Sequence, residues 1–88
     1  MEFSPSTRKL IEKVLKANKV PRIFWGQGFK KGAEFAEPYA KKKGHHFIKD
    51  DDVIDALKNL TPPEKRQELL EGLRKAGLKT EELFPDWK

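Results

Sequence analysis

Residues 21–48 constrain the fold of this chain more than any other stretch. They read Pro-Arg-Ile-Phe-Trp-Gly-Gln-Gly-Phe, then a Lys- and Ala-rich run, then Gly-His-His-Phe-Ile. The Ile-Phe-Trp of residues 23–25 consists of strand formers without polar alternation, as in a strand buried on both faces. The pattern therefore predicts a strand, a glycine turn, a helix over residues 29–43 and a short second strand over residues 45–48. Such a βαβ unit places ligands at the carboxyl end of its first strand.

The rest of the chain is predicted to be helical, with one helix before this unit and three after it. Ser4 followed by Pro5 is a helix-start signal. The predicted order is α-β-α-β-α-α-α, a single, mostly helical α/β domain over residues 1–88 with a two-stranded parallel βαβ element. Pro38 lacks an amide hydrogen, so we expect a kink or a break in the second helix. The alternative is an all-α bundle in which residues 23–25 are helix or loop.

Composition narrows the classes of partner. The formal net charge of +5 favours anionic ligands, acidic partners and, weakly, nucleic acid. The chain has no cysteine, which excludes disulfide frameworks and thiolate zinc sites. No apolar run approaches the length of a membrane span or a signal-peptide core, so we expect a soluble, cytoplasmic protein with no membrane partner. The open edges of a two-stranded sheet leave both a monomer and a dimer open.

The predicted glycine turn is the first candidate for a ligand site. Backbone amides of a turn that precedes a helix can bind a phosphate, and neighbouring cations would add to the attraction. However, neither the P-loop spacing nor the Rossmann fingerprint is present. Glycine also simply permits a tight turn, and we favour that interpretation. The candidate ligand- or phosphate-binding residues are Arg22, Gly26, Gln27, Gly28, Lys30 and Lys31.

A second candidate comes from a resemblance to a known family. Residues 23–26 (Ile-Phe-Trp-Gly) and residues 32–36 (Gly-Ala-Glu-Phe-Ala) are similar to a pattern of ADP-ribosyl cyclases and of bacterial toxin domains that cleave NAD. The resemblance implies that NAD is the substrate and that Trp25 stacks on its nicotinamide. Glu34 or Asp50 would then be the catalytic acid. The Thr-Leu-Glu that this family carries on its next strand is replaced here by Phe-Ile-Lys.

Two further motifs resemble metal ligands. His45 and His46 would point to opposite faces of a strand, so we expect one half-buried and one solvated histidine rather than a shared ion. Asp50, Asp51 and Asp52 are oxygen ligands of the kind that Mg²⁺ or Ca²⁺ takes. Acidic residues in a first helical turn are also ordinary caps and dipole partners, with Asp50 as the expected cap. We favour capping, and no metal site is predicted.

The sequence is most consistent with a small, non-enzymatic module that uses a basic interaction face and no cofactor. The expected face consists of Arg22, Lys30, Lys31 and residues 41–43. The alternatives are an NAD-cleaving, toxin-like domain and weak nucleic-acid binding through the same lysines. Lys and Glu fill the exposed helix positions, a local consistency that is sought in design and also found in thermophile proteins, so both an engineered and a natural origin stay open.

Overall fold

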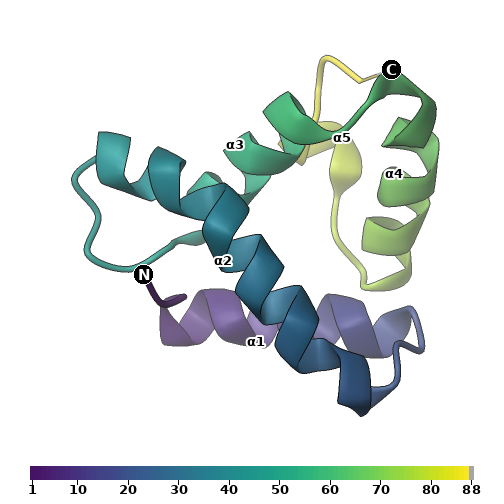
Figure 1. The fold of residues 1–88 in the computed structure, drawn as a ribbon. Coiled ribbons are helices and arrows are strands. Elements are labelled where there is room, and N and C mark those ends of the chain that lie inside the picture. Colours follow the sequence, from purple (N-terminus) through teal and green to yellow (C-terminus); the bar gives the residue numbers. More distant parts are fainter. Residues whose placement is uncertain (88) are drawn as a thin grey trace.

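The computed structural model describes residues 1–87, and these residues form an all-helical domain (Figure 1). Short 3₁₀ turns cover Arg22–Phe24 and Pro63–Lys65. The five α-helices of this part of the chain are α1 (Pro5–Ala17), α2 (Trp25–Lys42), α3 (Asp50–Leu60), α4 (Arg66–Lys75) and α5 (Thr80–Leu83). The predicted α/β class with a parallel βαβ element is therefore wrong, and the described residues take the all-α alternative.

The first predicted strand is instead the start of a helix. Pro21 has a φ of −59°, and the next three residues form a 3₁₀ turn that leads directly into α2. Ile23 is 82% exposed and Phe24 is 55% exposed, whereas a strand buried on both faces would hide them. Strand propensity depends on packing against neighbouring strands, and no strand lies beside this segment within residues 1–87. Without a partner strand, these strand-forming residues instead join the 3₁₀ turn and the first turn of α2.

The second predicted strand is reduced to one isolated parallel bridge, and its partner is the N-terminal segment. The bridge joins Phe3 and Ile48. The Ser4 amide donates to the Ile48 carbonyl, and the Ile48 amide donates to the Glu2 carbonyl, both at 2.9 Å. Gly44 has a φ of +77° and follows the end of α2, as the sequence predicted. The extended segment thus pairs with residues 2–4 rather than with residues 23–25.

Helix α2 is the longest element and passes through Pro38 without a break. Its buried face carries Ala36 and Ala40, both fully buried, and α3 presents Ala56 to the same cluster. Small side chains allow the two helices to approach closely, and the contact between α2 and α3 is more extensive than that between any other two helices of the described residues. This first core cluster contains Ala36, Ala40, Ile48 and Ala56, with Phe3, Ala33, Tyr39 and Val53 packed against it.

A second core cluster joins α4 to α1, α3 and the C-terminal segment. Its buried members are Leu70, Leu73 and Phe84, and Trp87 folds back onto Phe84 with ring centroids 4.5 Å apart. In Figure 1, α1 runs beneath α2, and α4 stands on the opposite side of the molecule from the α2–α3 loop.

None of the helices within residues 1–87 combines the length and the apolar character that a membrane span needs.

Candidate functional site

The three catalytic candidates of the NAD hypothesis, Trp25, Glu34 and Asp50, do not share one site. The Trp25 indole N–H donates to the Val20 carbonyl at 2.8 Å, and the Arg22 guanidinium lies 5.2 Å from its ring centroid. Arg22 therefore already covers the aromatic ring that the hypothesis assigns to the nicotinamide. Glu34 lies nine residues further along α2, which corresponds to two and a half turns, about 13 Å along the axis and on the opposite side of the helix.

Asp50 is the first residue of α3 rather than its cap, because Lys49 occupies the N-cap position. Its carboxylate accepts a hydrogen bond from the Thr7 hydroxyl, which is buried. The hollow beside Asp50 is lined by residues of the N-terminal segment and of the α3 start: Ser4, Ser6, Thr7, Lys49, Asp50 and Asp51. Neither Trp25 nor Glu34 lines it.

The predicted glycine turn does not form. Gly26, Gln27 and Gly28 all lie within the first turns of α2 and are exposed. Helical spacing places Gln27, Lys30, Lys31 and Glu34 around one shallow hollow, so that a carboxylate stands beside the two lysines. Both interpretations of these glycines assumed a turn, whereas the residues are helical; Lys30 and Lys31 are exposed cations.

Two of the cations in the predicted basic face form ion pairs within the domain. The Lys41 ammonium lies 3.2 Å from the Glu37 carboxylate. The Lys43 ammonium lies 3.1 Å from both Asp51 and Asp52, and it also contacts Asp55. These two cations at the C-terminal end of α2 are therefore largely compensated within the domain, unlike the cations near its N-terminal end.

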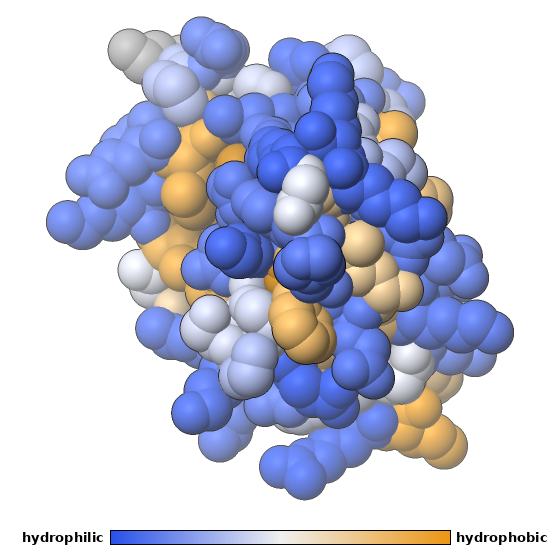
Figure 2. Space-filling view, turned by 90° about the vertical axis from the view of Figure 1, so that its left-hand side faces the viewer, coloured by the Kyte–Doolittle hydropathy of each residue, from blue (hydrophilic) through white to orange (hydrophobic). Residues whose placement is uncertain are grey.

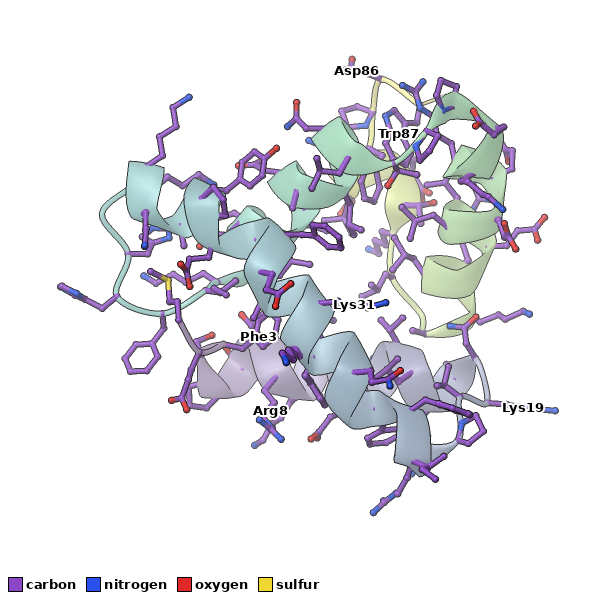
Figure 3. The ribbon with its side chains drawn as sticks, viewed as in Figure 1. Phe3, Arg8, Lys19, Lys31, Asp86 and Trp87 are labelled. Carbon is purple, nitrogen blue, oxygen red and sulfur yellow. The ribbon has the colours of Figure 1, made fainter. Side chains whose placement is uncertain are left out.

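Residues 13–33 form a continuous cationic segment without any acidic residue. This cationic segment covers the second half of α1, the connecting turn and the first half of α2. Within residues 1–87, none of its cations lies within ion-pair distance of a carboxylate. In Figure 3, Lys19 extends away from the body of the protein and Lys31 points from α2 toward the side of α4. The six cations of the cationic segment are Lys13, Lys16, Lys19, Arg22, Lys30 and Lys31.

Two apolar hollows adjoin this segment, and together we call them the apolar groove. The first, about 430 Å³, lies between α1 and α4, and the second, about 420 Å³, lies between α2 and α3. Thr61 lines both. No sequence pattern pointed to the groove, because its walls come from four helices. The first hollow is lined by Val14, Leu15, Asn18, Val20, Thr61, Lys65, Glu68, Leu69, Gly72 and Leu73, and the second by Gly32, Phe35, Ala36, Val53, Ala56, Leu57, Leu60, Thr61 and Pro62.

The α2–α3 loop carries a buried electrostatic cluster around Asp52, whose side chain is fully buried. Its Oδ2 accepts the Lys49 amide at 2.9 Å and the His45 Nδ1–H at 2.8 Å. Its Oδ1 lies 3.1 Å from the Lys43 ammonium, an ion pair whose direction is unsuited to a hydrogen bond. The prediction of one half-buried and one solvated histidine is confirmed, since His46 is exposed.

Burial by itself would raise the pKa of Asp52, but the contacts with the Lys49 amide, the His45 ring and the Lys43 ammonium outweigh it and lower that pKa. The Asp55 carboxylate, supported by Asp51 and Asp52, raises the pKa of Lys43 despite partial desolvation. One oxygen or nitrogen each of His45, Asp51 and Asp52 lies within 4.8 Å of the others. The Lys43 ammonium lies among the carboxylates of Asp51, Asp52 and Asp55. Figure 2 shows the side of the molecule that carries this loop, where hydrophilic residues dominate and the orange patches are separate.

The lowered pKa of Asp52 predicts how stability depends on pH. Because the folded-state pKa lies below the ordinary value of 3.8, the stabilisation is fully present above that value and is lost as pH falls through the folded pKa. We expect the free energy of unfolding to fall in this acid range, as measured by urea denaturation at a series of pH values. Asp52→Asn should flatten this part of the profile. An unchanged profile in that variant would contradict the assignment to Asp52.

Comparison with protein-family models, with curated proteins and with solved structures finds no match to this chain. The fold of residues 1–87 defines the class of this protein as a small all-helical domain.

Proposed function

We propose that this chain is a non-enzymatic binding module that holds a polyanionic partner through the cationic segment, residues 13–33. The observation that carries the proposal is that six cations follow one another along this segment with no acidic residue between them, and none lies within ion-pair distance of a carboxylate within residues 1–87. A cation without an internal partner is free to bind an external anion. A concentration of such cations on one part of the surface also attracts anionic partners over distance.

Two features of the segment favour contact with a partner. Ile23 and Phe24 are exposed at the turn between α1 and α2, where they add apolar contact area beside Arg22. The Arg22 guanidinium is held against Trp25, so less conformational freedom would be lost on binding than for a free side chain. The cationic segment therefore combines charge with apolar surface, as interaction sites commonly do.

No contact in the structure favours the NAD-cleaving alternative, which stays a prediction from the resemblance. Its test is incubation of the protein with NAD⁺ and measurement of the released nicotinamide. Turnover that Trp25→Ala abolishes would support the enzyme and count against a purely binding role.

The binding proposal is tested with two polyanions, a fluorescent thymidine oligonucleotide and poly-glutamate. We expect affinity for both to fall steeply between about 50 and about 200 mM salt, because released counterions drive such binding. The variant Arg22→Gln/Lys30→Gln/Lys31→Gln should bind at least about tenfold more weakly, and its plot of log K against log salt should be shallower by about 2 units for a single strand.

The matched control is Lys9→Gln/Lys42→Gln/Lys75→Gln, which removes the same charge from exposed positions outside the cationic segment. It should lose markedly less affinity. Equal losses in the two variants would show that net charge alone determines binding, and the proposed segment would then have no special role.

A further inference from the structure

The cationic segment and the apolar groove share a wall. Val14, Leu15 and Val20 belong to residues 13–33 and line the first hollow of the groove. Gly32 belongs to the same residues and lines the second hollow. A ligand in the groove would therefore contact apolar residues of the cationic segment, and the six cations would flank it, since none of them lines either hollow.

The charges at the rim of the groove also favour an acidic occupant. Lys31 precedes the groove residue Gly32 and points toward the side of α4 (Figure 3). Lys65 lines the groove from the opposite side. The acidic residue that lines it, Glu68, has a side chain 78% exposed and lies 3.7 Å from Lys65, so this pair is close to neutral. Lys31 shares a neighbouring hollow with Glu34 but is not within ion-pair distance of a carboxylate in residues 1–87.

The shape of the groove fits an elongated apolar stripe better than a compact small molecule. Its two hollows share Thr61 as a lining residue, so the α1–α4 hollow and the α2–α3 hollow are neighbours. Phe35 and Leu60, in the second hollow, are 57% and 52% exposed, whereas small-molecule sites bury most of the ligand and of their own lining. Recurring apolar side chains on one face of a helix are the usual occupants of such grooves.

We propose that the groove binds an amphipathic helix of a protein partner, with the apolar face of that helix against Leu15, Leu69 and Leu60 and acidic residues on its flanks. This inference rests on the proposed binding function and names the partner as a protein helix. The acidic flanks would pair with the cations of residues 13–33 while the apolar stripe covers the exposed leucine and phenylalanine of the second hollow. A nucleic acid would use the cations and leave the groove empty.

The test uses synthetic peptides of about 18 residues, a length at which isolated helices become appreciable. One peptide carries Leu at i, i+3, i+4 and i+7 positions and Glu elsewhere. A second has the same composition in permuted order, and a third replaces Glu with Lys. We expect the first to bind at least about tenfold more tightly than either of the others, which is about 1.4 kcal/mol.

Groove variants separate this inference from the general binding function. Phe35→Ser/Leu60→Ser should weaken binding of the amphipathic peptide about tenfold or more while leaving oligonucleotide affinity within about twofold. Phe47→Ser is the matched control, because Phe47 is 50% exposed and lies outside the groove. It should leave both affinities unchanged. Circular dichroism and thermal melting establish that each variant is folded.

Each outcome decides one proposal. Binding of the oligonucleotide without preference for the amphipathic peptide would overturn the helix partner and leave the polyanion function standing. Failure of every anionic probe would overturn both. A third experiment uses anionic vesicles. If the protein binds the vesicles but not the peptide, and Ile23→Ser/Phe24→Ser abolishes vesicle binding, then the partner is a lipid surface and the groove has no role.

Discussion

Alanine in place of Asp52 is expected to lower the free energy of unfolding by about 3 kcal/mol, as when one partner of a buried ion pair is removed. The variant loses the acceptor for the Lys49 amide, the partner of His45 and one of the carboxylates around Lys43. For a domain of this size the midpoint of thermal unfolding should fall by more than about 10 °C. Urea denaturation and thermal circular dichroism measure both quantities.

Two further variants separate the effect of burial at Asp52 from the effect of removing a carboxylate charge. Asp51→Ala removes the neighbouring carboxylate, whose side chain is 60% exposed, and should change the free energy of unfolding by less than about 0.5 kcal/mol. Asp52→Asn keeps an acceptor for the Lys49 amide, so it should cost less than the alanine variant. If Asp51→Ala and Asp52→Ala were equally destabilising, the buried cluster would not be the anchor of the α2–α3 loop.

Alanine in place of Phe84 is expected to cost about 3–4 kcal/mol, because it empties a buried aromatic position. Phe84 is 2% exposed, belongs to the second core cluster and stacks against Trp87. Its loss should therefore also release the C-terminal segment. In a Trp25→Phe background, the fluorescence of Trp87 should shift to longer wavelength while α1 to α4 remain folded.

Phe47→Ala is the matched control for this second variant. It makes the same chemical change at a phenylalanine that is 50% exposed, and we expect less than about 0.5 kcal/mol of destabilisation. A small effect of Phe84→Ala, comparable with that of the control, would mean that the α4–α5 end of the core contributes little to stability.

Helix starts and stops were the features best predicted from local sequence. Ser4 is the N-cap of α1, and its hydroxyl accepts the Thr7 amide at 3.3 Å. Gly77 has a φ of +83° just beyond α4, a conformation that glycine commonly adopts after a helix end. The left-handed residue after α1 is Lys19, with a φ of 55°. The neighbouring Asn18 is held by its side chain, whose amide donates to the carbonyls of Val14 and Gly72.

Of the features of the candidate site, the sequence predicted only its exposed positive charges. Arg22, Lys30 and Lys31 are exposed cations, as expected. The sequence did not predict that Lys43, at the C-terminal end of α2, contacts carboxylates eight to twelve residues away. The sequence also did not predict the apolar groove, because the spacing of Leu15 and Leu69 is that of ordinary core residues in two separate helices. Their partial exposure follows from how α1 and α4 pack.

The amino-acid sequence by itself determined where most helices begin and end, that thiol chemistry is absent, and that the chain is basic with a long acid-free stretch. Caps, left-handed glycines and charge runs act over a few residues, so they can be read locally. The conformation of residues 23–25, the pairing of Ile48 with the N-terminal segment, the burial of Asp52 and the groove were decided only by tertiary structure. Each depends on which distant segments meet: a strand needs a neighbouring strand, and a groove needs helices whose packing leaves apolar surface uncovered.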